Sequence, residues 1–366
     1  MGNALPRPHV PLSSLACRFW NKNQVNVVPS FPRLGEMEMM VETSRTTVVV
    51  AVSFCVIVLC VLAVFVSSRK PRIDRRVSNV AVSSTGSWLA AGTAQGKITV
   101  WNHTNGTAPQ QITFSTALYG ELNDLRFSPD EHVLAIASGD LGMYAPAESA
   151  RPRLLRSDHE NYGSVRFSQD GQNLLVVTGA AVIETLDAHS GALRLKVCCS
   201  SIYGEVTFTP DGEAIANAGH WPSLWDARSG ELLGRLTTHR EFETFRPIAF
   251  DDRRGTILMG SQDGRVYAWN LSKRQLVAIS PPQSAYVDTL AASTTGWVVF
   301  AGFGKSVELW NPDTGQRRSW TAARPTSNLV LGPDGTSIIF GTANGTVEFW
   351  DIKTEQRIRA LKISGT

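Results

Sequence analysis

The chain has 366 residues, of which 43% are hydrophobic and 18% are charged, and it carries a formal net charge of +3. This composition excludes a disordered chain, a collagen-like repeat and a small secreted domain held together by disulfides. Residues 1–76 hold 10 Lys and Arg against 4 Asp and Glu, whereas residues 77–366 hold 25 against 28. A dedicated nucleic-acid binder would carry a basic patch on its main body, so nucleic acid is not an expected partner.

Residues 46–68 form a run of 23 residues without a charged side chain. At a rise of ~1.5 Å per residue, a helix of this length crosses the ~30 Å hydrocarbon core of a bilayer, so the run predicts a single transmembrane α-helix. A basic cluster follows it directly and consists of Arg69, Lys70, Arg72, Arg75 and Arg76. The positive-inside rule then predicts a single-pass membrane location with the main body in the cytoplasm. We expect the same cluster to contact anionic lipid headgroups.

The segments around this run complete the predicted domain organisation. Residues 1–45 are rich in proline and without periodicity, which indicates a disordered N-terminal tail, and Met37 offers an alternative start. Residues 69–76 form a basic juxtamembrane linker. A signal peptide cleaved after Ser68 is the rival interpretation. Its apolar region would be longer than the ~7–15 residues usual for such peptides.

From residue 77 to residue 366 a unit of four short strands recurs seven times. The third strand of each unit ends at residues 101–102, 143–144, 186–187, 225–226, 269–270, 310–311 and 350–351, most of which pair Trp with Asp or Asn. A turn between the first and second strands keeps the same period, as in SPDE (128–131), SQDG (168–171) and TPDG (209–212). Pro, Asp and Gly at such positions favour hairpin turns. The second strands are apolar on both faces, which predicts that they are buried between neighbouring sheets.

Two of these units, residues 208–233 and 331–358, resemble WD-repeat blades, and the resemblance covers about 290 residues. It implies an all-β, seven-bladed β-propeller that serves as a protein scaffold. The usual Gly-His dipeptide is missing, and the turn Asp survives only at Asp263, so quinoprotein-like or lactonase-like propellers remain alternatives. Residues 358–364 complete the last blade and Val77 begins the first, so we expect the ring to close without the usual strand exchange.

The sequence contains no pattern that indicates catalysis. His-Glu-x-x-His, Cys-x-x-Cys and Asp-x-Asp-x-Asp-Gly are absent, so we predict no metal site, no cofactor and no enzyme activity. Residues 304–306 (Gly-Lys-Ser) lack the upstream Gly of a phosphate-binding loop and are interpreted as a hairpin turn. The adjacent Cys198 and Cys199 are interpreted as two thiols, and a vicinal disulfide beside a quinone cofactor is the alternative.

Candidate binding residues lie in the loops that enter each blade and in the turns between second and third strands. Aromatic rings in equivalent loops would surround the channel and form a platform for a partner protein, with arginines nearby to donate hydrogen bonds. The predicted partner-binding residues are Tyr119, Tyr162, Tyr203, His220, Trp221, Phe245, Arg246, Tyr286 and Arg324. The alternative is that these rings fill the space between blades as core.

These observations predict a membrane-anchored, non-catalytic propeller that docks a membrane-associated protein. One alternative is a propeller enzyme outside the cytoplasm, quinoprotein-like or lactonase-like, with its active site at the channel mouth. Another is a structural subunit of a membrane complex, in which the transmembrane helix makes the decisive contacts. Propeller architecture alone does not choose between them, because one fold serves many functions.

Overall fold

The computed structural model describes residues 76–102, 110–116, 118–197, 204–236, 244–302, 304, 306–322, 325 and 328–363. The chain divides into two compact units, residues 1–72 and 73–366. The predicted tail, the apolar run 46–68 and the linker up to Arg75 lie outside the described residues. Among the described residues, no helix has the length and apolarity that a membrane crossing requires.

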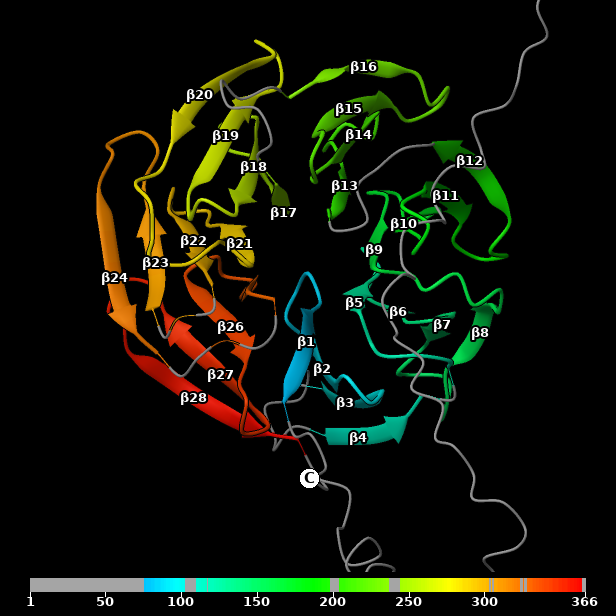
Figure 1. The fold of residues 1–366 in the computed structure, drawn as a ribbon. Helices are drawn as coiled ribbons and strands as arrows, with labels where there is room; N and C mark the ends of the chain where they lie inside the picture. The colour runs from blue at the N-terminus through cyan, green and yellow to red at the C-terminus, as the bar shows by residue number, and fades with distance from the viewer. Residues whose placement is uncertain are drawn as a thin grey trace, which may run out of the picture. The chain divides into compact units, whose positions relative to one another are not determined.

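The described part of the second unit is all-β and consists of seven four-stranded antiparallel sheets, each built from consecutive strands. Figure 1 shows these sheets as blades arranged in a ring. Blade 1 contains β1 (Val77–Val82), β2 (Trp88–Thr93), β3 (Lys97–Asn102) and β4 (Gln110–Ser115), and blade 2 contains β5 (Asp124–Phe127), β6 (Leu134–Ala137), β7 (Leu141–Tyr144) and β8 (Arg153–Arg156). Blade 3 contains β9 (Ser164–Phe167), β10 (Asn173–Val177), β11 (Ile183–Asp187) and β12 (Leu193–Val197). Blade 4 contains β13 (Val206–Phe208), β14 (Ala214–Asn217), β15 (Ser223–Asp226) and β16 (Leu232–Arg235). Blades 5 to 7 contain β17 (Phe245–Asp251), β18 (Thr256–Ser261), β19 (Val266–Asn270), β20 (Gln275–Ile279); β21 (Thr289–Ala292), β22 (Val298–Ala301), β23 (Ser306–Trp310), β24 (Arg317–Thr321); and β25 (Val330–Leu331), β26 (Ser337–Gly341), β27 (Thr346–Asp351), β28 (Arg357–Lys362).

The burial of the strands follows their place in each blade. The second strands are covered on both faces, and every residue of β6, β14, β18, β22 and β26 is buried. The outer strands are largely exposed, as the pattern of β28 shows. Apolar side chains from neighbouring sheets pack together, so the core is a set of interfaces between blades. The prediction of a seven-bladed propeller is confirmed.

The hairpin turns have the chemistry that their sequence predicts. In blades 2, 3 and 4 the hydroxyl of Ser128, Ser168 or Thr209 donates to an Asp two residues later. These bonds lower the pKa values of the Asp carboxyls, which are Asp130, Asp170 and Asp211. Glycine supplies the left-handed exit in blades 3 and 4, with φ of 72° and 71°. In these three blades a local hydrogen bond therefore helps to fix the turn.

Among the described strands, none is shared between blade 7 and blade 1, and hydrogen bonds join the two blades. Asn328 lies just before β25 of blade 7, and its amide pairs with the backbone of Val80 in β1 of blade 1. Val80 N donates to Asn328 Oδ1 over 2.9 Å, and Asn328 Nδ2 donates to Val80 O over 2.9 Å. Val77 N also donates to Thr342 O over 3.2 Å. The Asn328 amide thus satisfies both backbone groups of Val80 as a neighbouring strand would.

Asn328→Ala should weaken this closure. The substitution leaves the N–H and C=O of Val80 without partners, so we expect the free energy of unfolding to fall by about 2–3 kcal/mol. Hydrogen exchange of the Val80 amide should accelerate as well, because its acceptor is lost. Gln316→Ala, a change at an exposed position, serves as the control. A Val80 amide that stays fully protected in Asn328→Ala would contradict the proposed closure.

Candidate functional site: the mouth of the channel

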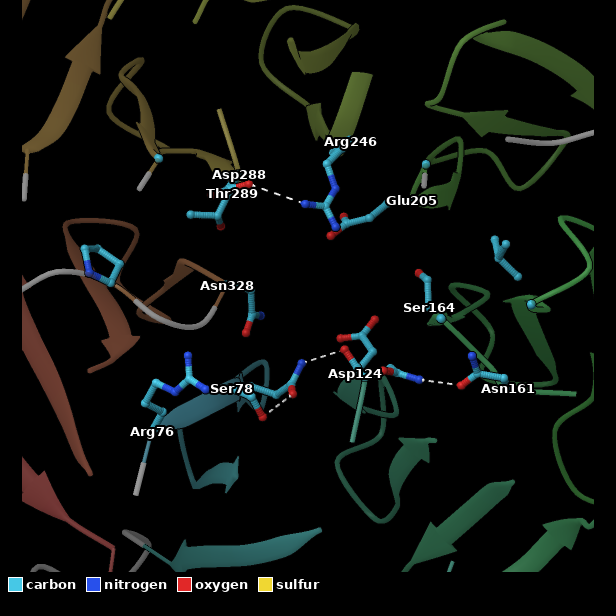
Figure 2. A pocket seen from close by; sticks show the side chains of 18 of the residues that line it. Arg76, Ser78, Asp124, Asn161, Ser164, Glu205, Arg246, Asp288, Thr289 and Asn328 are labelled. Atoms are coloured by element: carbon cyan, nitrogen blue, oxygen red, sulfur yellow. Dashed lines mark hydrogen bonds and ion pairs between the residues drawn. The ribbon is translucent and has the colours of Figure 1, made fainter. Parts of the chain in front are cut away.

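A cavity of about 620 Å³ lies at one end of the channel. The starts of the first strands and the turns between second and third strands line it, and Figure 2 shows side chains from several blades around the space. We call the side of the propeller that carries these turns and the loops entering each blade the mouth face. Arg76, Asp124, Glu205, Arg246 and Asp288 contribute charge to the lining, so the cavity is polar and contains both signs.

A ring of mostly polar side chains surrounds the channel at one level of the first strands. Its members stand four residues before the first hairpin turn of each blade and are Asn79, Asp124, Ser164, Glu205, Pro247, Thr289 and Asn328. Three of them accept a hydrogen bond from the backbone of the next blade. Val165 N donates to Asp124 Oδ2 over 3.2 Å, and Leu329 N donates to Thr289 Oγ1 over 2.6 Å. Val80 N donates to Asn328 Oδ1 over 2.9 Å.

Three of the remaining blade boundaries are also crossed by polar contacts near the channel. Asn79 Nδ2 donates to Asn123 O over 2.7 Å, which joins blade 1 to blade 2. The residues Glu205 and Arg246 join blade 4 to blade 5 through a backbone bond of 3.0 Å from Glu205 N to Arg246 O. Arg246 Nη1 lies 3.6 Å from Asp288 Oδ1 at the entrance to blade 6. These contacts hold the mouth in one shape, which favours binding because little side-chain freedom remains to be lost.

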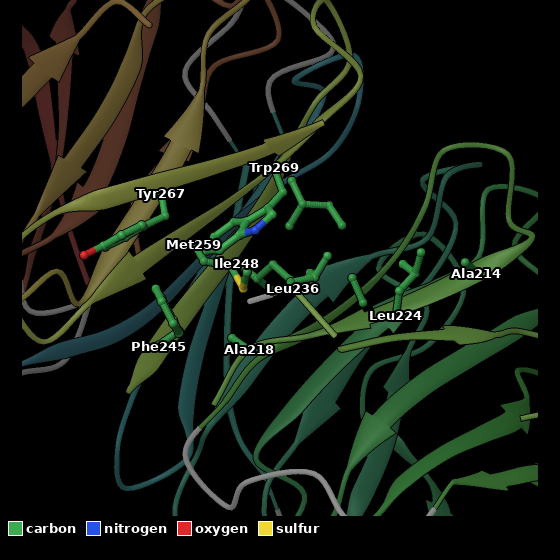
Figure 3. Packing of buried hydrophobic residues seen from close by; sticks show 11 residues of the cluster. Ala214, Ala218, Leu224, Leu236, Phe245, Ile248, Met259, Tyr267 and Trp269 are labelled. Atoms are coloured by element: carbon green, nitrogen blue, oxygen red, sulfur yellow. The ribbon is translucent and has the colours of Figure 1, made fainter. Parts of the chain in front are cut away.

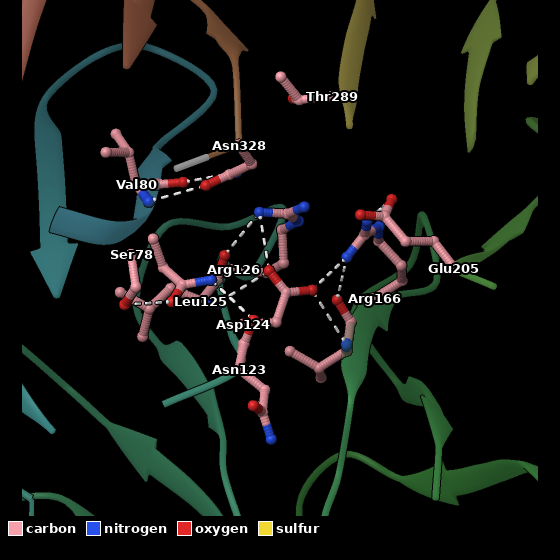
Figure 4. A network of polar contacts seen from close by, with 12 residues as sticks. Ser78, Val80, Asn123, Asp124, Leu125, Arg126, Arg166, Glu205, Thr289 and Asn328 are labelled. Atoms are coloured by element: carbon pink, nitrogen blue, oxygen red, sulfur yellow. Dashed lines mark hydrogen bonds and ion pairs between the residues drawn. The ribbon is translucent and has the colours of Figure 1, made fainter. Parts of the chain in front are cut away.

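Asp124 is the centre of the most extensive of these contacts (Figure 4). Its carboxylate lies 3.1 Å from Arg126 Nη1 and 2.5 Å from Arg166 Nη1, and Arg166 Nη2 donates to Glu205 Oε2 over 2.9 Å. Burial works against the charged form of Arg166, but the two carboxylates outweigh it and its pKa is raised. Arg166 therefore links blades 2, 3 and 4 as a charged bridge.

Several predicted binding residues are exposed on the mouth face. Tyr119 is 64% exposed, Trp221 is 60% exposed and Tyr286 is 37% exposed. Other side chains hold two of these rings in place. Tyr119 lies 4.6 Å from the ring of His159, and Arg235 lies 4.8 Å from the centre of the Trp221 ring. Large, fixed aromatic rings of this kind are enriched at the centres of protein interfaces.

Two further predicted residues contribute polar groups. His220 is exposed, and its Nδ1 lies 2.8 Å from Thr244 Oγ1. The Arg246 side chain is 47% exposed and lines the cavity beside Asp288. Arg76, which the sequence assigned to the membrane surface, lines the same cavity. The predicted residues Tyr203 and Arg324, the pair Cys198 and Cys199, and the basic residues Arg69, Lys70, Arg72 and Arg75 lie outside the described residues.

The prediction is wrong for Tyr162 and Phe245, which are 0% and 1% exposed. Phe245 packs edge-on against Tyr267 and Trp269, at ring distances of 5.3 and 5.8 Å, between blades 4 and 5 (Figure 3). Tyr162 fills the corresponding space between blades 2 and 3. Burial, together with a hydrogen bond to Asp158, raises the pKa of Tyr162. These rings belong to the core, as the alternative interpretation held.

Asp124, Glu205, Thr289 and Asn328 were missed by the sequence analysis. The signal was present in the printed sequence, since six of the seven repeats carry Asn, Asp, Ser, Glu or Thr four residues before the turn. In a single repeat, a polar residue at the start of an apolar strand is interpreted as facing solvent. Its place in the channel follows only from the arrangement of the other blades around it. Within the described residues, no group of three or more His, Cys, Asp or Glu could hold a metal ion.

Comparison with known proteins finds similarity to WD-repeat proteins. Residues 71–102 match the family described as WD domain, G-beta repeat. The chain is 27% identical over 213 residues to WD repeat-containing protein 55 of Mus musculus, a match that covers 56% of this chain and 53% of that protein. It is 25% identical over 282 residues to the Pre-rRNA-processing protein crb3/ipi3 of Schizosaccharomyces pombe, which covers 77% of this chain and 57% of that protein. The chain thus spans about half the length of these relatives.

The comparisons correct the predicted location. A single-pass membrane protein with a cytoplasmic propeller was expected, whereas the relatives that match are a WD repeat-containing protein and a pre-rRNA-processing protein. The predicted membrane location rested on residues 46–76, nearly all of which lie outside the described residues. The match to the pre-rRNA-processing protein extends over 77% of the chain. The structure and the comparisons together identify a seven-bladed β-propeller that carries a WD40 repeat and is similar to WD-repeat proteins.

Proposed function

We propose that the propeller is a non-catalytic platform that binds a protein partner on its mouth face. The observation that carries this proposal is the 620 Å³ polar cavity, which is bordered by hydrogen bonds between blades, on a face that also exposes the rings of Tyr119, Trp221 and Tyr286. An extended segment of a partner would place polar groups in the cavity and apolar side chains against the rings. Central aromatic anchors with a polar surround are the arrangement that provides most of the binding energy in protein interfaces.

The relatives support a proposal about the assembly in which this platform acts. The relative that matches 77% of the chain is named a pre-rRNA-processing protein. We infer that the partner of the mouth face is a protein of a pre-rRNA-processing assembly. The propeller would then position proteins of that assembly, and it would carry out no chemistry itself.

Affinity purification of the tagged full chain from its own cells tests the platform. The triple variant Tyr119→Ala, Trp221→Ala, Arg246→Ala removes the exposed groups of the mouth face. The matched control Leu154→Ala, Leu193→Ala, Ile358→Ala removes side chains that are 49%, 52% and 58% exposed on outer strands. We expect the partner proteins to fall at least about tenfold with the first variant and to persist with the control. Equal recovery with both variants would overturn the proposal.

Depletion of the protein tests the assembly separately. We expect unprocessed pre-rRNA to accumulate, and we expect the outer-strand variant, but not the mouth-face variant, to restore processing. Normal pre-rRNA after complete depletion would exclude this assembly and leave the binding platform itself standing.

A further inference from the structure

A second cavity, of about 280 Å³, lies further along the channel. Its lining includes members of the polar ring, such as Glu205, and side chains that stand two residues after the ring on the first strands and therefore point into the channel at the next level. On one side are two neighbouring arginines, Arg126 and Arg166. On the other side the small apolar side chains of Ala249, Ala291 and Val330 leave the space open.

The two arginines have the same local geometry but different partners. Each donates from Nη1 to the carbonyl of the preceding residue over 2.8 Å. Arg166 also pairs with two carboxylates, those of Asp124 and Glu205. Arg126 pairs only with Asp124, at 3.1 Å, and shares it with Arg166. Among the described residues, both of these contacts of Arg126 use Nη1, and no hydrogen bond from its Nε or Nη2 is formed.

The surroundings of Arg126 favour an anion. Its side chain is 22% exposed, so its free N–H groups are largely removed from water but can be reached through the cavity. Burial lowers its pKa and the neighbouring Arg166 adds to this, which means that the charged form lacks sufficient compensation. Buried donors without acceptors carry a desolvation cost that a charged acceptor would offset. Glu205 is the acidic group that also lines the cavity, and it accepts a hydrogen bond from Arg166.

We propose that this second cavity binds a single oxyanion, a carboxylate or phosphate group, through Nε and Nη2 of Arg126. A guanidinium presents these two donors in the planar fork that matches two oxygens of such a group. The apolar wall opposite would exclude water and leave room for the remainder of the ligand. The two cavities share Glu205, Thr289 and Asn328, but this proposal does not depend on the function proposed for the mouth face.

Thermal unfolding of the full chain in the presence of anions tests the site. Sodium phosphate and sodium acetate are titrated separately against sodium chloride of equal ionic strength. We expect a saturable rise in Tm with at least one of the two oxyanions, because a ligand that binds only the folded state stabilises it. The anion that produces the rise in Tm shows whether the site binds a phosphate group or a carboxylate group. If neither phosphate nor acetate raises Tm more than sodium chloride does, the proposal is overturned.

Two variants locate the effect. Arg126→Gln should raise the half-saturating concentration by about tenfold or more, because two charge-assisted hydrogen bonds are lost. Arg151→Gln removes the same charge from an exposed loop and should leave the titration unchanged. Ala291→Leu keeps both arginines but fills the cavity, so it should abolish the saturable rise in Tm. This variant also tests the site if Arg126→Gln fails to fold. Saturation that persists unchanged in Ala291→Leu would place the anion elsewhere and refute the site.

Discussion

Replacing Asp124 by alanine should lower the free energy of unfolding by about 3–5 kcal/mol, since it removes one partner of a buried ion pair. The residue is 6% exposed, and its carboxylate contacts the guanidinium groups of Arg126 and Arg166 and the backbone N–H of Val165. After the substitution Arg166 keeps Glu205, but Arg126 has no carboxylate partner left. The two neighbouring positive charges would then repel each other without the carboxylate that lies between them. Urea-induced unfolding followed by tryptophan fluorescence measures the change.

Two further variants separate charge from packing at this position. Asp124→Asn keeps the shape and an acceptor for Val165 N but loses the charge, so we expect a smaller loss of roughly 1–3 kcal/mol. Asp252→Ala removes an exposed carboxylate in a hairpin turn and should change stability by no more than about 0.5 kcal/mol. If Asp124→Ala were no more destabilising than Asp252→Ala, the network would not hold the blades together.

Phe245→Ala should destabilise the propeller by about 3–5 kcal/mol, because it empties a fully packed site between blades 4 and 5. The ring is 1% exposed and contacts Tyr267 and Trp269 edge-on. Phe245→Leu retains most of the apolar volume, so its loss should be nearer to about 1 kcal/mol. The midpoints of urea unfolding for the two variants and the unchanged chain give the comparison.

Substitutions at Tyr119 and Phe245 distinguish a partner-binding residue from a core residue. Tyr119→Ala should leave the free energy of unfolding within about 0.5 kcal/mol of the unchanged chain, because its ring is 64% exposed. Phe245→Leu, in conditions where it is folded, should recover partner proteins as well as the unchanged chain does. Loss of the partner with Phe245→Leu at full stability would restore this ring to the binding surface and contradict its assignment to the core.

The parts of the mouth face that could be predicted were those in the repeated loops. Tyr119, Trp221 and Tyr286 are in loops or turns whose place follows from the repeat, and they are exposed. Phe245 and Tyr162 are equally aromatic, but they stand two residues before the polar ring, where Leu122 and Val287 are also buried, and they point between blades. The direction of a side chain at the start of a strand depends on where the neighbouring blade packs, which a single repeat does not contain.

The sequence by itself determined the number of blades, the places where their third strands end and the turns between their first and second strands. These features depend on alternation of side chains and on Asp and Gly in turns, which act over a few residues. Only the tertiary structure decided what the channel contains. Asn328 and Val80 are 248 residues apart in the chain and meet because the ring closes. Asp124 and Glu205 became channel residues for the same reason, since a polar group at the start of a strand acquires its surroundings from other blades.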